Sequence, residues 1–112
     1  RMLDAYNREL PLPKTCPVHV QTLQIGKTLS LVAVAGEVCV EIGLGIKSMI
    51  GEGPRFVLGY TNRVIGYIPS KAIHADGGYE VDGWYFYENM PSYLAADAED
   101  IIVGAVGEML AE

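Results

Sequence analysis

Apolar and polar residues alternate near the start of the chain in a pattern that predicts two paired strands. Val18–Ile25 alternates as a half-buried strand does. Gly26 and Lys27 follow as a two-residue loop whose leading glycine suits a type II′ turn, so Thr28–Ala35 is expected to return antiparallel. Within the second strand, Leu29–Val34 is almost entirely apolar, which predicts a strand covered on both faces.

The next apolar stretch fits two different elements. A strand is indicated by alternation at Val38, Val40, Ile42, Leu44 and Ile46, whereas one helical face would hold Val38, Ile42, Ile46 and Met49. Continuing the preceding strand would make it about 19 residues long, well beyond the usual 3–10. We therefore expect a helix that begins just after Glu37, despite Gly43 and Gly45. Glu37 would then lie at a strand-to-helix turn, at the positive end of the helix dipole, which favours the ionised carboxylate that a metal needs.

Later segments predict a further strand and two helices. Arg55–Tyr60 is expected to form a strand and Thr61–Gly66 a loop, and Pro69 can begin a short helix over Ser70–Ala75 because proline is tolerated at a first helical position. Ala95–Ala111 has the periodicity of a final helix, whose inner face would hold Ala98, Ile101, Ile102, Ala105, Val106, Met109 and Leu110.

The N-terminal segment predicts a helix and a stiff connector. Residues 2 to 9 can form a short helix, and three prolines at 11, 13 and 17 keep the chain extended after it. The whole pattern predicts a mixed α+β fold of the α/β type: a strand hairpin plus further strands in a mixed sheet covered by helices. We treat residues 1–112 as a single domain or fragment, with 1–17 as helix and proline-rich connector.

Composition excludes several classes of function. The 112 residues carry a net charge of −6, and the eight Lys and Arg are scattered, so no nucleic-acid partner is expected. No run reaches the roughly 18 apolar residues of a membrane helix, and no signal segment begins the chain, so we expect a soluble protein of unknown compartment. Cys16 and Cys39 are too few for a disulfide framework or structural zinc site and are expected to be ordinary buried or half-buried thiols.

Three polar residues stand beside glycines in segments that predict a site. Glu37 lies in VAGEVCVE, Tyr67 in YTNRVIGYIPS and Tyr79 in GGYEVDGWYFY. Glycine tolerates backbone conformations that other residues avoid, so these positions suit sharply bent backbone around a polar site. Tyr67 follows Asn62 by five positions, and Tyr79 follows Tyr67 by twelve.

From about Val18 to the C-terminus, these segments resemble the end of the catalytic domain of the neutral/alkaline (non-lysosomal) ceramidases, which are zinc amidohydrolases. By this resemblance Glu37, in Ala35-Gly36-Glu37, takes the place of a glutamate zinc ligand in a Pro-Gly-Glu turn. Tyr67 takes the place of a tyrosine zinc ligand. Tyr79, in Gly78-Tyr79-Glu80, takes the place of a tyrosine that steadies the oxyanion.

The resemblance implies that the chain is the C-terminal portion of a larger catalytic domain. The family's two histidine zinc ligands lie upstream, in motifs that neither His19 nor His74 resembles. The expected partners are therefore the missing N-terminal part of the domain and a lipid-like N-acyl amide substrate, and the expected cofactor is zinc. The chain alone is expected to bind zinc weakly, to lack hydrolase activity and to expose apolar surface through which it self-associates.

A second hypothesis is a non-catalytic α/β module that docks on a partner or on itself. Glu37 would then be a helix-capping or surface carboxylate, and Tyr67 and Tyr79 would be amphipathic residues at the edge of the core. The aromatic cluster Trp84–Tyr87 could line a lipid pocket, although packing into a core is the more common use of such a cluster. The two hypotheses differ in whether the three side chains converge on one exposed face.

Overall fold

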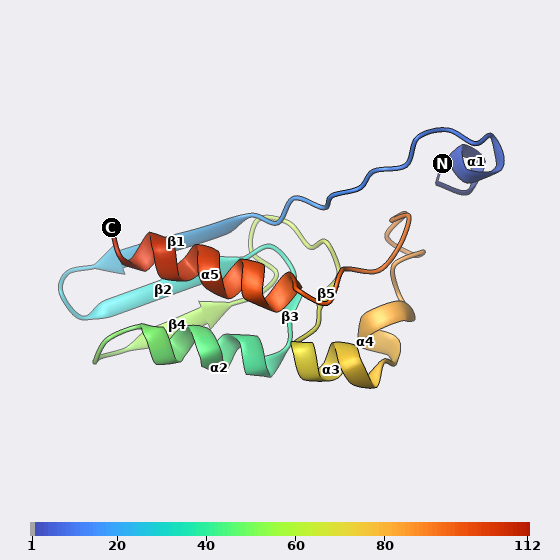
Figure 1. The fold of residues 1–112 in the computed structure, drawn as a ribbon. Coiled ribbons are helices and arrows are strands. Elements are labelled where there is room, and N and C mark those ends of the chain that lie inside the picture. The colour runs from blue at the N-terminus through green and yellow to red at the C-terminus, as the bar shows by residue number, and fades with distance from the viewer. Residues whose placement is uncertain (1) are drawn as a thin grey trace.

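A three-stranded mixed sheet forms the centre of the computed structural model, which describes residues 2–112 (Figure 1). Its strands are β1 (Val20–Ile25), β2 (Leu29–Val34) and β4 (Arg55–Leu58), in the order β1-β2-β4. β1 and β2 pair antiparallel, whereas β2 and β4 pair parallel. The mixed α+β fold with a mixed sheet and helices is therefore confirmed.

Two helices cover one face of this sheet. They are α2 (Val40–Met49) and α5 (Ala98–Leu110), which lie beside each other in Figure 1. Alternate residues of β2 point into the layer between sheet and helices, as the pleat of a strand requires. The fully or nearly fully buried members of this core include Val32, Val34, Ile42, Ile46, Ile102 and Val106.

The opposite face of the sheet remains open, so the expectation that β2 is covered on both faces is wrong. Leu31 points away from the core, between Leu23 of β1 and Phe56 of β4 in the strand register. Leu23 and Phe56 are each about half exposed. An apolar run shows that both faces of a strand could be buried, but burial of a face also needs a second layer of helices or strands to pack against it.

Strand register also corrects the predicted hairpin turn. Ile25 pairs with Leu29, so the loop contains three residues, Gly26 to Thr28, rather than two. Gly26 has a φ of 63°, a left-handed conformation that costs glycine little. The antiparallel return of the chain, which the glycine predicted, is confirmed.

The helix expected after Glu37 exists but begins later. Glu37–Val38 forms the short strand β3, Cys39 is the N-cap, and α2 starts at Val40. Ile42 and Ile46 are buried at helical spacing, which confirms the helical interpretation of this stretch. Glu37 itself lies in a strand, so its predicted place directly at the helix start is wrong.

The second half of the chain adds short elements that hold the site. β5 (Tyr67–Ile68) and α4 (Tyr79–Asp82) were not predicted, and α3 (Lys71–Asp76) begins after Ser70, whose side chain accepts a hydrogen bond from the Ile73 amide. The final helix begins at Ala98, and its Ile101 is 62% exposed, against the prediction that it faces inward.

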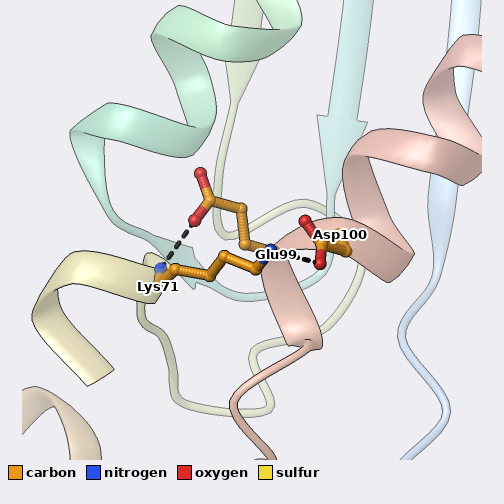
Figure 2. Close-up of polar contacts among 3 residues, drawn as sticks. All are labelled: Lys71, Glu99 and Asp100. Carbon is orange, nitrogen blue, oxygen red and sulfur yellow. Dashed lines mark hydrogen bonds and ion pairs between the residues drawn. The ribbon is translucent and has the colours of Figure 1, made fainter. Parts of the chain in front are cut away.

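Helices α3 and α5 are joined by polar contacts at their N-terminal ends (Figure 2). The backbone amide of Lys71 donates to Glu99 Oε2 at 2.6 Å, and the Lys71 Nζ lies 2.6 Å from Asp100 Oδ2. The hydrogen bond and negative charge of Asp100 raise the pKa of Lys71. These contacts fasten the segment between the two site tyrosines to the helical layer.

The N-terminal segment leaves the body of the protein. Helix α1 (Met2–Asn7) matches the expected short helix, and residues 10–19 have no helix or strand. In Figure 1 this connector runs as an extended arm from β1 to α1. The Met2 amide donates to Asn89 Oδ1 at 2.9 Å and so links the arm to the loop before α5.

Candidate functional site

Two short strands bring Glu37 and Tyr67 together although thirty positions of sequence separate them. β3 and β5 pair parallel, and Glu37 is the register partner of Tyr67. The Glu37 amide donates to the carbonyl of Gly66 at 2.8 Å, and the Cys39 amide donates to the carbonyl of Ile68 at 3.1 Å. Register partners point to the same side of a sheet, so the carboxylate and the phenol share one face.

Glycines make this close approach possible. A Cβ at Gly36 would lie 2.5 Å from Ile68 Cδ1, and a Cβ at Gly66 would lie 2.0 Å from Trp84 Cζ3. Gly66 also has a φ of 110°, which side-chain-bearing residues rarely adopt. The glycines beside Glu37 and Tyr67, which drew attention in the sequence, are therefore required by packing at the site.

The third candidate, Tyr79, lies in the same cluster. It begins α4, and its ring centroid is 5.7 Å from that of Tyr67 in an edge-to-face arrangement. On the other side, Tyr67 contacts Trp84 with centroids 6.2 Å apart. Trp84 is only 3% exposed and donates its indole N–H to the Glu80 carbonyl at 2.9 Å. The ring of Trp84 is therefore held in place where it contacts Tyr67.

A fourth residue, Tyr60, belongs to the cluster but was not among the candidates. It follows β4, and its backbone amide donates to the carbonyl of Gly36, the residue before Glu37, at 3.0 Å. In the sequence, Tyr60 is the last residue of the predicted strand Arg55–Tyr60. Its position next to Gly59, in the same segment that holds Tyr67, is the signal that could have drawn attention to it.

The negative charge of Glu37 shapes the acidity of both neighbouring phenols. The hydrogen bond to Glu37, loss of solvent and the carboxylate charge together raise the pKa of Tyr60 to about 12. Burial, then the charge and hydrogen bonding of Glu37, raise the pKa of Tyr67 as well. The carboxylate of Glu37 therefore disfavours loss of the proton from either phenol.

The donor set fits part of a zinc coordination shell. A catalytic zinc takes three protein ligands or more from nitrogen, sulfur or oxygen donors, and here Glu37 and Tyr67 offer two oxygens. Across residues 2–112 no group of three or more His, Cys, Asp or Glu could hold a metal ion. His74 lies elsewhere, with its Nε2 3.0 Å from the Leu94 carbonyl oxygen, and His19 lies just before β1. The described residues therefore supply two of the ligands that a catalytic zinc needs.

The two cysteines, the cavity and the aromatic segment add no reactive group to the cluster. Burial raises the pKa of Cys16 and of Cys39, which lowers the thiolate fraction that reactivity and metal binding need. A cavity of about 540 Å³ lies along the N-terminal arm and α5, away from Glu37. Trp84 packs inside, but Phe86 and Tyr87 are exposed, so the aromatic segment is only partly core.

Comparisons with protein-family models, with curated proteins and with solved structures found no match. Among residues 2–112, the helices are too short, or not apolar enough, for any of them to cross a membrane. The structure itself shows a mixed α+β fold, in which Glu37, Tyr67 and Tyr79 lie close together.

Proposed function

We propose that the chain is the C-terminal portion of a zinc-dependent amidohydrolase resembling the neutral ceramidases, and that it contributes half of the metal site. Glu37 and Tyr67 are the metal ligands in this proposal, and Tyr79 is the oxyanion-stabilising group. The pairing of Glu37 with Tyr67 across β3 and β5 is the observation that supports it most strongly. A half-site needs two donors that face the same side, and this register supplies them.

The exposed setting of the cluster also supports a half-site. Tyr60 is 60% exposed and Tyr79 is 55% exposed, whereas Glu37 and Tyr67 are half-buried, so none of the four side chains is part of the buried core. The two further zinc ligands would come from the upstream part of the catalytic domain. That part would also close over the cluster and exclude water, which strengthens every electrostatic interaction inside.

Each residue has a defined task in this proposal. Zinc, when bound, supplies a Lewis acid that lowers the pKa of a bound water toward about 7. Glu37 supplies a carboxylate oxygen and Tyr67 a phenol oxygen as ligands. Tyr79 donates its hydroxyl proton in a hydrogen bond to the amide carbonyl oxygen as negative charge develops there. The substrate class is a lipid-like N-acyl amide.

An amidase assay on the full-length parent, with and without a chelator, tests this proposal. Glu37→Ala and Tyr67→Phe should reduce activity to the level of the chelated enzyme, and Tyr79→Phe should lower kcat by about 10²–10³. Glu41→Ala is a matched control, because Glu41 is an exposed carboxylate on α2. Unchanged activity in both Glu37→Ala and Tyr67→Phe would remove the metal assignment.

A second candidate function is a non-catalytic module that associates through the open face of the sheet. Exposed Leu23 and Phe56 on that face favour it, because exposed apolar patches mark interaction surfaces. This module would bind a partner or itself without needing Glu37. Retention of partner binding in Glu37→Ala, together with no zinc-dependent activity in the parent, would favour the module.

A further inference from the structure

A largely apolar cavity lies between the N-terminal arm and α5. Its volume is about 540 Å³, within the range of about 300–1,000 Å³ that is typical of small-molecule sites. The arm supplies one wall through Cys16 and Val18, and α5 supplies another through Ala98, Ile101 and Ala105. Each of these side chains is half-buried or exposed, so a ligand can reach the cavity from solvent.

The wall that α5 supplies is long and consists mostly of small side chains. Ala98, Ile101 and Ala105 follow at spacings of three and four positions, so they share one face of the helix. Their seven-residue span extends for about 10 Å at the rise of an α-helix. The two alanines leave space that larger side chains would fill, and Ile101 is 62% exposed beside that space. An elongated apolar cavity of this kind suits a linear aliphatic chain.

Charged side chains beside the cavity favour a negatively charged head group on that chain. Lys14 lines the cavity and has no ion pair among residues 2–112. Asp97 also lines it, but Asp97 is the N-cap of α5, where the helix dipole stabilises a carboxylate. The positive charge of Lys14 is therefore the one that still lacks a partner.

We propose that this cavity binds a linear aliphatic carboxylate, whose chain lies against α5 and whose head group pairs with Lys14. This inference goes beyond the proposed function and does not rest on it, because the cavity lies away from Glu37 and needs no metal. The chain supplies most of the affinity, since each methylene group that leaves water should tighten binding by about fourfold. An exposed ion pair at Lys14 adds about two- to fivefold and selects the head group.

Calorimetric titration of the 112-residue chain with hexanoate, octanoate and decanoate tests the apolar part of the site. Affinity should rise by about fourfold for each added methylene group, and Ile101→Glu should weaken octanoate binding by about tenfold or more. Leu44→Glu is the matched control, because Leu44 is 59% exposed on α2, outside the cavity lining. Both changes are at exposed positions and should leave the fold intact. Equal affinity for the three carboxylates, or equal weakening by the two variants, would overturn the inference.

A head-group series tests the role of Lys14. Octanoate, octanol and octylammonium share one chain, and octanoate should bind most tightly of the three. Lys14→Gln should weaken octanoate binding by about two- to fivefold and leave octanol binding unchanged. Glu37→Gln should change neither, which separates this inference from the proposed function. Tighter binding of octylammonium than of octanoate would refute the carboxylate as ligand, and loss of octanoate binding in Glu37→Gln would refute the cavity as its site.

Discussion

Gly66→Ala should be one of the most damaging single-methyl changes in the chain. The new Cβ would lie 2.0 Å from Trp84 Cζ3 and 2.5 Å from its Cε3, closer than real Cβ contacts come. Trp84 is buried and its indole N–H is hydrogen-bonded, so moving the ring away from the new methyl group would break that bond and disturb the packing around the ring. Overpacking of this kind costs about 1–3 kcal/mol.

Backbone strain adds to this steric cost. Gly66 has a φ of 110°, and a side-chain-bearing residue held in such a region is strained by about 1–3 kcal/mol. The two effects together predict a loss of about 2–6 kcal/mol, which is a large part of the 5–15 kcal/mol by which native domains are stable. The amide of Glu37 donates to the carbonyl of Gly66, so the site should be disturbed along with the fold.

Urea denaturation, monitored by tryptophan fluorescence, measures this loss of stability. The signal comes from the packed ring itself, because Trp84 is the chain's one tryptophan. Gly77→Ala is the matched control. Gly77 has a φ of 74°, but no atom lies within 4 Å of the place that an added methyl carbon would occupy, so this change brings the backbone strain without the steric contact. A Gly66→Ala protein that loses no more stability than Gly77→Ala would refute the packing of Trp84 against Gly66.

Three further outcomes are expected. Because the folded-state pKa of Tyr60 is raised to about 12, its contribution to stability should be complete below about pH 10 and lost as the pH rises toward 12; ultraviolet titration should show this late phenol, and Glu37→Gln should abolish it. Gly43→Ala should raise the free energy of unfolding by about 0.5–1 kcal/mol, since Gly43 lies inside α2 with open space around it, and equal or lower stability in urea would contradict this. Phe56→Lys should reduce self-association in sedimentation velocity, whereas Val40→Lys, on the outer side of α2, should not; equal effects would exclude the sheet face as the contact.

Regular elements with strong periodicity could be predicted from the sequence, and elements defined by tertiary pairing could not. The hairpin and α2 are set by local signals, namely a glycine turn and the helical spacing of Ile42 and Ile46. β3 and β5 are two residues each, and no periodicity exists over two residues. They form because backbone groups far apart in the sequence hydrogen-bond to each other. The pattern of residues within one short segment does not reveal such pairing.

The site was predictable in part for the same reason. Glycines beside Glu37 and Tyr67 indicated bent, closely packed backbone, and the structure brings these two residues into register. Tyr60 was missed because a tyrosine at the end of an apolar run is typical of a strand. Its left-handed backbone occurs together with a hydrogen bond from its amide to the Gly36 carbonyl, which joins the segment after β4 to the segment after β2.

Different residues fix the backbone of the candidate site and carry its polar groups, so the two can be changed separately by mutation. Strand pairing and the closely packed glycines Gly36 and Gly66 fix the backbone, whereas the side chains of Tyr60 and Tyr79 are mostly exposed and contribute little to the core. Tyr79→Phe, which removes one hydroxyl from a mostly exposed side chain, should therefore leave the fold intact, because surface substitutions usually alter stability by less than about 0.5 kcal/mol. For Glu37→Gln, an unchanged unfolding transition would show that any change in activity comes from the carboxylate itself, because the backbone at this position is held by the hydrogen bond from the Glu37 amide to the Gly66 carbonyl.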